Sequence, residues 1–292
     1  MQNETPVIRA EDLTYIYSQG TPYQKVALDH VNLSIETGAM VGVIGHTGSG
    51  KSTLIQHFNG LLRPTSGKIY IDGEDMWAQP SQIRRFRFKV GLVFQYPEYQ
   101  LFEETVYKDI AFGPKNMGMS ESEIDTAVRR SAQFVGLSED QLDKSPFELS
   151  GGQKRRVAIA GVLAMNPEVL ILDEPTAGLD PMGRDMILGQ IREYHQQQGN
   201  TVLLVSHSME DVAKYCPKAL VVNDSKLFLY DTVEEVFSHA QELTGMGLAV
   251  PQVSSIFLRL RQLGYPVSER VFTVGQAQDE LLRVLKEGKG DE

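Results

Sequence analysis

The chain has 292 residues, of which 41% are hydrophobic and 23% are charged, and its formal net charge is −10. This composition is typical of a globular protein with a full core, whereas the acidic balance argues against sequence-independent nucleic-acid binding. No apolar run is long enough to cross a bilayer, the N-terminus lacks the features of a secretion signal, and the single Cys216 excludes an intrachain disulfide. We therefore expect a cytosolic chain in which Cys216 is a buried core residue.

Short apolar runs alternate with helix-like stretches along most of the chain. Such alternation predicts an α/β fold, in which helices pack on a parallel sheet. Strands are expected at residues 7–17, 31–35, 40–44, 68–71, 90–94, 169–172, 201–206 and 220–223, with a helix at 52–62.

The middle and the end of the chain depart from this alternation. The pattern is mostly helical at about 98–165, which predicts a helical subdomain inserted into the sheet domain. Near residue 250, glycines and Pro251 interrupt the chain, and amphipathic stretches follow at 254–263 and 278–286. We therefore expect a main domain at 1–240 and a small helical extension at 241–292.

A glycine-rich segment lies between the expected strand at 40–44 and the helix at 52–62. Its sequence, Gly45-His46-Thr47-Gly48-Ser49-Gly50-Lys51-Ser52, fits the phosphate-binding pattern G-x-x-x-x-G-K-[ST]. Glycines let the backbone N–H groups wrap closely around phosphate, and the helix N-terminus adds positive potential. Lys51 should reach the β- and γ-phosphates of ATP, Ser52 should bind Mg²⁺, and Thr53 should join the nucleotide contacts. A glycine-rich turn that matches by chance is the weaker alternative, because both flanking elements are present.

Two acids end the apolar run at 169–172. Ligands of a parallel sheet bind beyond the carboxyl ends of its strands, so Asp173 should lie near the phosphate-binding loop and hold Mg²⁺. Glu174 can then act as a general base on a water molecule. The alternative is that the two acids cap the next helix, but their place beside a phosphate-binding loop favours catalysis.

The segment Leu149–Gln153 reads LSGGQ, and with it the chain resembles the ATPase subunits of ABC transporters over roughly residues 5–240. The resemblance implies a P-loop NTPase fold, with an antiparallel β subdomain beside the parallel core. It also implies nucleotide contacts from the signature residues Ser150, Gly151, Gly152 and Gln153, and from Asp180 of the D-loop.

Three more positions match the pattern of this family. Tyr17 matches the aromatic residue that stacks on adenine, although Tyr15 lies on the same face of the strand and competes with it. Gln95 matches the glutamine that touches Mg²⁺ and the attacking water, and His207 matches the histidine at the γ-phosphate. The resemblance thus implies catalytic roles for Lys51, Gln95, Glu174 and His207, and a metal site of Ser52, Gln95 and Asp173.

The LSGGQ signature also implies a dimer. In this family the signature of one subunit closes over the ATP that the phosphate-binding loop of another subunit holds. The chain carries one such loop and one signature, so we expect that it cannot complete a site alone.

Two stretches are similar to a narrower group, the ATPases of energy-coupling factor (ECF) transporters, and especially to the second of their two paired types. They read HFNGLL at 57–62 and FQYPEYQLFEETVYKDIAFGPKN at 94–116. This resemblance implies a second, similar but different ATPase, a transmembrane coupling protein and membrane subunits that bind vitamins or other micronutrients. It also implies a peripheral position on the cytoplasmic face of the cell membrane, with the extension at 241–292 joining the ATPase pair.

The coupling protein is expected to dock near Tyr96–Glu104. Large apolar side chains there accompany Glu98, Glu103 and Glu104, so we expect an acidic and apolar groove that suits arginine on a coupling helix. An ordinary solvated turn is the alternative. The turn Asn223–Lys226, where relatives often place glycine, is expected to lie far from the phosphates.

Two other functions compete with an ECF importer. The first is the ATPase of a dedicated cobalt, nickel or other ABC importer. The second is a soluble ABC protein of DNA repair or translation. Repair proteins of that kind insert long coiled coils before the signature, and the short separation of Lys51 from Ser150 leaves no room for them. Translation factors of that kind carry two ATPase units in a chain, whereas this chain has one.

Overall fold

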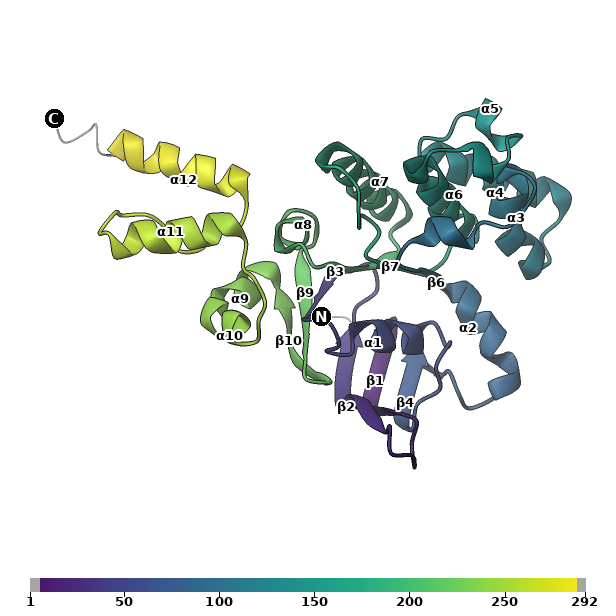
Figure 1. Cartoon of the computed structure of the whole chain (residues 1–292), viewed down its shortest axis with the longest axis horizontal. Coiled ribbons are helices and arrows are strands. Elements are labelled where there is room, and N and C mark those ends of the chain that lie inside the picture. Colours follow the sequence, from purple (N-terminus) through teal and green to yellow (C-terminus); the bar gives the residue numbers. More distant parts are fainter. Residues whose placement is uncertain (1–5, 288–292) are drawn as a thin grey trace.

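The computed structural model describes residues 6–287, in which the strands form two sheets (Figure 1). The larger sheet of this part of the chain has the order β10-β9-β3-β8-β7-β6, and all neighbours pair in parallel except β9 and β10. The predicted α/β fold with a parallel core is therefore confirmed. The strands of this sheet are β3 (Met40–Ile44), β6 (Val90–Val93), β7 (Val169–Asp173), β8 (Thr201–Val205), β9 (Lys218–Asn223) and β10 (Lys226–Thr232).

The centre of the larger sheet is covered on both faces. Every residue of β3, β7 and β8 is buried, as their unbroken apolar sequences predict. Alternate side chains of β7 enter two different cores, with Leu170 and Leu172 in one and Val169 and Ile171 in the other. The sheet is thus held from both sides, which fixes the positions of its strand ends.

The smaller, antiparallel sheet has the order β2-β1-β4-β5. It packs together with α1 (Lys51–Phe58) on one face of the larger sheet, where they share a core. The strand predicted at 31–35 is the end of the longer β2. The strands of this sheet are β1 (Ile8–Tyr17), β2 (Lys25–Ile35), β4 (Ser66–Ile71) and β5 (Glu74–Asp75).

The helical subdomain lies on the right of Figure 1, beyond the edge strand β6. Side-chain caps begin its longer helices: Thr105 accepts a hydrogen bond from the backbone N–H of Lys108, and Ser120 and Ser150 form capping boxes. Its elements are η2 (Pro97–Gln100), α3 (Val106–Met117), α4 (Glu121–Phe134), α5 (Glu139–Leu142), η3 (Pro146–Glu148) and α6 (Gly151–Leu163).

Several elements had no predicted counterpart. The longest is α7, which begins after the N-cap Asp180 and ends at Gly199 in a left-handed conformation, both ordinary helix signals. Cys216 follows α8 and is buried, and burial raises the pKa of its thiol to about 12, so its prediction as a core residue is confirmed. The elements of this group include η1 (Pro80–Gln82), α2 (Ile83–Lys89) and α7 (Pro181–Gln198). In contrast, α8 (Met209–Tyr215) lies in a helix-like stretch of the sequence that ends at Cys216, and β10 completes the hairpin at the expected turn Asn223–Lys226.

The C-terminal helices divide between two cores. Phe237 of α9 (Val233–Ser238) and Leu243 of α10 (Ala240–Gly245) belong to the main core. Beyond them, α11 (Gln252–Gln262) and α12 (Val274–Glu287) share a small core that includes Phe257 and Val271. Figure 1 shows these two helices at the opposite end of the molecule from α3–α6. Between residues 6 and 287, none of the helices combines the length and hydropathy that a membrane span requires.

Candidate functional site

A cavity of about 330 Å³ opens beside the carboxyl ends of β3, β6, β7 and β8. It brings together most of the residues predicted to act on a nucleotide, although they come from distant parts of the sequence. The lining consists of Tyr17, Lys25, Ala27, Thr47, Gly48, Gly50, Lys51, Ser52, Thr53, Gln95, Asp173, Glu174, Val205 and His207.

The loop at residues 45–52 needs glycine where it passes close to other backbone. A Cβ at Gly45 would lie 2.3 Å from the carbonyl oxygen of Val222, and one at Gly50 would lie 2.4 Å from that of Ala27. Gly50 also has a φ of 112°, which side chains disfavour. Glycine therefore lets the loop press against the sheet while its N–H groups stay at the start of α1, where a phosphate can bind.

The ammonium group of Lys51 is held inside this loop. Its side chain is buried, and Nζ donates hydrogen bonds to the carbonyl oxygens of Gly45, at 2.6 Å, and His46, at 3.0 Å. Burial lowers the pKa of Lys51, while the charges of Glu174 and Asp173 oppose that shift. The cation is thus poised next to neutral acceptors, in a place where phosphate oxygens would be stronger partners.

The two acids lie at the end of β7, as predicted. Asp173 is buried and receives a hydrogen bond from Ser52, and burial raises its pKa. Burial also raises the pKa of Glu174 to about 7, and the charge of Asp173 adds to that rise. Glu174 has a φ of 52°, and its backbone N–H donates to the carbonyl of Val205 on β8. A carboxylate with a pKa near neutrality is suited to accept a proton.

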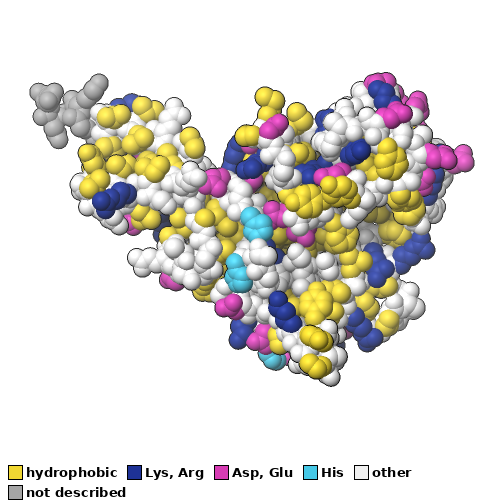
Figure 2. Space-filling model, viewed as in Figure 1, with side chains coloured by type: hydrophobic (Ala, Val, Ile, Leu, Met, Phe, Trp, Pro, Cys, Tyr) yellow, Lys and Arg dark blue, Asp and Glu magenta, His cyan; other side chains and the backbone are white. Residues whose placement is uncertain are grey.

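His207 follows β8 and faces Glu174. Its Nε2 lies 3.3 Å from Oε1 of Glu174. Burial lowers the pKa of His207, and the charge of Lys51 lowers it further. Both shifts favour the neutral imidazole, and Oε1 of Glu174 has no hydrogen-bond partner among the described residues. Figure 2 shows histidine and acidic side chains close together in the central part of the visible face.

Tyr17 and Gln95 lie at the rim of the cavity. Tyr17, rather than Tyr15, lines it, and the Tyr17 hydroxyl lies 3.2 Å from Oγ1 of Thr53. Tyr15 instead packs between Tyr17 and His57, with ring centroids 4.8 and 4.7 Å away, so it supports the Tyr17 ring from the side. Gln95 follows β6 with its side chain exposed at the cavity.

The signature and the D-loop residue lie outside this lining of described residues. Ser150 and Gln153 close the start of α6, where each side chain accepts a hydrogen bond from the backbone N–H of the other. Asp180 caps α7 by accepting from the backbone N–H of Gly183 at 2.7 Å. Gly151 and Gly152 open α6 and have open space where a Cβ would be. The N-terminus of α6 is therefore not part of the lining of this cavity.

Three residues of the lining were missed in the sequence: Lys25, Ala27 and Val205. Lys25 is placed there because β2 pairs with β1 so that Lys25 lies opposite Tyr17. Only the sheet register brings Lys25 to the cavity, and the sequence pattern does not give that register. Val205 was within an expected strand, but its place in the lining depends on where β8 ends.

The prediction for the turn Asn223–Lys226 was wrong, since this turn contacts the phosphate-binding loop. The backbone N–H of Ser225 donates to the carbonyl of Ser49 at 3.0 Å, and Oδ1 of Asp224 lies 3.6 Å from Nε2 of His46. The cause is topological: β9 pairs in parallel with β3, so both strands end at the same edge of the sheet. The contact could not be predicted from the sequence, because the turn and the loop are far apart along the chain.

The prediction that Glu98 contributes to an acidic docking surface was also wrong. Its side chain is 15% exposed and points inward, where it pairs with the buried Arg155 at 2.7 Å. Glu104, just before α3, is exposed and pairs with Lys108 in the first turn of that helix. Burial of the Glu98–Arg155 pair removes its charge from the surface.

An apolar groove of about 710 Å³ does lie next to this segment, between α2, α3 and α6. Gln100, Leu101 and Phe102 form one edge of it, and Phe88 and Phe112 are also in its lining. Its charged residues are Arg84, Arg87 and Asp109, so the groove is not predominantly acidic. The two guanidinium groups bond to the carbonyl oxygens of Asn116 and Gly60.

The residues expected to hold Mg²⁺ fit such an ion. Ser52, Gln95 and Asp173 offer hydroxyl, amide and carboxylate oxygens around one cavity, and Mg²⁺ prefers oxygen ligands. In the described part of the chain, no cluster of three or more His, Cys, Asp and Glu side chains could hold a metal unaided. That pattern fits an ion whose other ligands are phosphates and water.

Comparisons with known proteins agree on one family. Residues 28–177 match the family described as ABC transporter. The energy-coupling factor transporter ATP-binding protein EcfA2 of Clostridium acetobutylicum is 57% identical over 283 residues, covering 97% of this chain and 99% of that protein. The protein of the same name from Geobacillus kaustophilus is 47% identical, covering 94% of this chain and 96% of its own length.

Solved structures give the same result. One is cbiO1 from Clostridium perfringens, described as part of the ABC transporter complex cbiONQ, with a TM-score of 0.74 and 39% identity over 89% of this chain and 98% of that one. Another is the dimeric post-hydrolysis state of the ATP-binding cassette MJ0796 bound to ADP and Pi. Its TM-score is 0.70 and its identity 28%, over 77% of this chain and 98% of that one.

The raised pKa of Glu174 predicts how stability depends on pH. Glu174 binds a proton more tightly in the folded protein than in the unfolded chain, so the free energy of unfolding of the nucleotide-free protein should fall as the pH rises from 4.5 to about 7. That pKa difference corresponds to a contribution on the order of 3 kcal/mol. Urea unfolding of the wild type and of Glu174→Gln across this range measures it, because the variant lacks the titrating group. A constant difference between the two proteins would contradict the assignment.

Proposed function

The chain belongs to the ABC transporter ATPases, in the group of energy-coupling factor ATP-binding proteins, and we propose that its cavity binds ATP with Mg²⁺ and hydrolyses it to power micronutrient uptake. One observation carries this proposal. The cavity joins the phosphate-binding loop, Asp173, Glu174, Gln95 and His207 at one edge of the parallel sheet, whereas the signature at the start of α6 remains free for a second site.

Each residue has a distinct role in the proposed reaction. Backbone N–H groups of the loop and Nζ of Lys51 bind the β- and γ-phosphates, and Tyr17 stacks on the adenine. Ser52, Asp173 and Gln95 would hold Mg²⁺, which would offset negative charge on the phosphates. These contacts fix the γ-phosphate near Glu174.

Proton transfer is the proposed task of Glu174. Its carboxylate accepts a proton from the attacking water, and Gln95 helps to orient that water. His207, whose Nε2 lies 3.3 Å from Oε1 of Glu174, would contact the γ-phosphate once the site is closed. Burial of the acid, which raises its pKa, also makes it a better base than an exposed carboxylate.

We propose that a second ATPase subunit completes the site. The N–H groups at the start of α6, with Ser150, Gly151, Gly152 and Gln153, would face the γ-phosphate that the partner binds, and Asp180 would lie near the same junction. ATP binding would then close the pair, and hydrolysis would let it open. MJ0796 is dimeric in two solved structures, one of them bound to ADP and Pi, which supports this arrangement.

The C-terminal extension is proposed to strengthen this pairing. Large apolar side chains remain exposed on its helices, and Figure 2 shows hydrophobic side chains across the surface of this end of the molecule. Exposed apolar area of this kind is a usual feature of subunit contacts. The side chains concerned are Ile256, Leu263, Val274, Leu281, Leu282 and Leu285.

We propose that the apolar groove beside α3 receives the transmembrane coupling protein, which would place the chain on the cytoplasmic face of the membrane. Phe102 and Phe112 contact each other there and are 59% and 46% exposed, a large unpaired area for a surface. Substrate-binding membrane subunits would complete the importer. The weaker similarity to cbiO1 leaves a dedicated importer as the less favoured alternative.

Replacing the proposed base tests the catalytic assignment. Glu174→Gln should retain ATP binding and lower the rate of hydrolysis by about 10² or more, because an amide cannot accept the proton. ATP affinity and steady-state phosphate release, measured on the assembled ATPase pair, separate the two effects. Near-normal hydrolysis would rule out Glu174 as the base.

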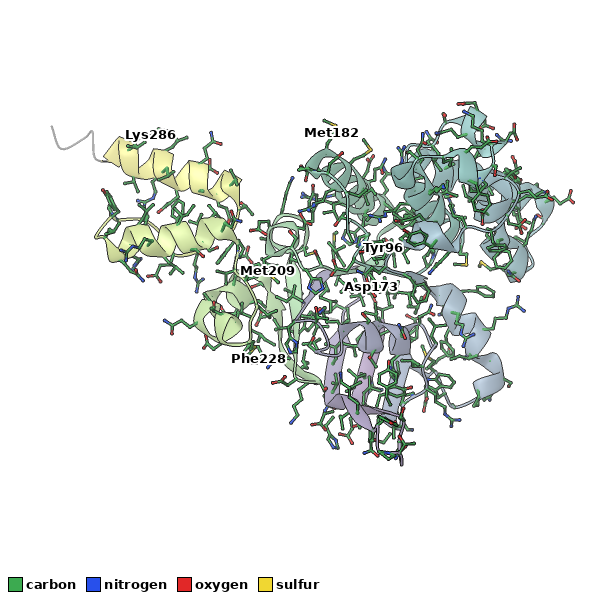
Figure 3. The ribbon with its side chains drawn as sticks, viewed as in Figure 1. Tyr96, Asp173, Met182, Met209, Phe228 and Lys286 are labelled. Atoms are coloured by element: carbon green, nitrogen blue, oxygen red, sulfur yellow. The ribbon has the colours of Figure 1, made fainter. Side chains whose placement is uncertain are left out.

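Removing one aromatic ring from the groove tests the docking assignment. Phe112→Ala should reduce the amount of membrane partner that co-purifies with the tagged chain by about tenfold, as expected for a buried interface residue, and should leave ATP affinity unchanged. Phe228→Ala is the matched control, because Phe228 on β10 is similarly exposed (40%) and lies away from the groove. Figure 3 labels Phe228 just below the helices α9 and α10. Equal recovery with both variants would exclude docking at the groove.

A further inference from the structure

Arg155 joins three segments that are far apart in the sequence. It lies in the first turns of α6 and is 3% exposed. Nε and Nη2 donate to the two carboxylate oxygens of Glu98, at 3.0 and 2.7 Å. Nη1 donates to the carbonyl oxygens of Ala177, at 2.6 Å, and Pro175, at 3.3 Å. One guanidinium group therefore ties the signature helix both to η2 and to the segment that follows Glu174.

The two ends of this network lie at different functional regions. Glu98 belongs to η2, and the next residues, Gln100, Leu101 and Phe102, form an edge of the apolar groove. Pro175 and Ala177 lie between Glu174 and the cap residue Asp180. Figure 3 labels Tyr96, at the start of η2, and Asp173 in the same central part of the molecule. The network thus connects the groove edge with the chain beside the catalytic carboxylate.

The chemistry of the pair favours concerted movement. A bidentate arginine–carboxylate pair has a fixed geometry. Separating the pair would leave an unpaired charge buried in the protein, which strongly destabilises the fold. Glu98 keeps a lowered pKa, despite a burial effect in the other direction, because it is hydrogen-bonded to Arg155. A displacement of η2 is therefore transmitted to Arg155 more readily than the pair is broken.

We propose that Glu98 and Arg155 are a positioning pair that couples the groove edge to the segment 175–180, so that nucleotide occupancy changes the docking surface. The inference rests on the proposed function, because it uses the assigned nucleotide site and groove. Coupling between two sites is reciprocal, so a partner in the groove would in turn affect the segment 175–180. A purely structural clamp is the competing explanation, and it would stabilise both regions whether or not ATP is bound.

Hydrogen exchange of the full chain separates these explanations, with ATP as the probe. The parent protein is Glu174→Gln, which should bind ATP without hydrolysing it. In the parent, ATP should slow amide hydrogen exchange by about fivefold or more at both 97–102 and 175–180. The expected reason is that local opening becomes less frequent in both segments when ATP binds. Adding Glu98→Gln, which removes the charge and leaves the Arg155 contacts to Pro175 and Ala177 in place, should abolish the response at 97–102 and keep that at 175–180.

Two control variants accompany this measurement. Glu104→Gln breaks an exposed pair in the same segment and should leave both responses intact. Glu98→Asp keeps a carboxylate and should restore part of the response at 97–102, which also covers the case in which Glu98→Gln folds poorly. An unchanged ATP response at 97–102 in Glu98→Gln overturns the coupling while leaving the proposed function standing. A parent that binds ATP but shows no response at either segment also overturns the coupling, whereas a parent that binds no ATP counts against the proposed function.

Discussion

The parallel pairing of β3, β7 and β8 is the constraint on which the rest of the site depends. Parallel strands end at a common edge, so the residues that follow each of them meet there regardless of their separation in the sequence. Lys51, Asp173 and His207 come together for that reason. The two cores hold β7 from both faces and so fix the position of this edge, where Lys51 and Asp173 keep hydrogen-bond partners from the loop at residues 45–52.

The same edge creates an unusual electrostatic environment. Lys51, Asp173 and Glu174 are all shielded from water, and burial shifts the pKa of each toward its neutral form. A bound phosphate and its cation would replace water as the partners of these groups. The turn at 223–226 stabilises the loop at residues 45–52 through the hydrogen bond from the Ser225 backbone N–H to the Ser49 carbonyl. The turn at 223–226 therefore stabilises the loop of the site without contacting the reacting atoms.

Local sequence was sufficient for the parts of the site that a single segment forms. The glycine-rich loop, the acids after β7 and the main strands were all predictable, because each depends on a short run of residues and its two flanks. Lys25, Ser225 and the Glu98–Arg155 pair were not, because strand register and tertiary packing bring them into place. Glu98 shows the limit most clearly: an acid in an apolar surface segment can point outward or pair inward, and only the position of Arg155 decides between them.

One chain is proposed to supply only half of a working site. The most direct measurement is the rate of ATP hydrolysis per subunit across a dilution series of the assembled ATPase pair. Analytical ultracentrifugation at each concentration shows whether single chains or pairs are present. The rate per subunit should fall on dilution as paired subunits separate, and should return when paired subunits re-form at higher concentration. Sustained hydrolysis by a species with the mass of a single chain, 32.6 kDa, would contradict the claim.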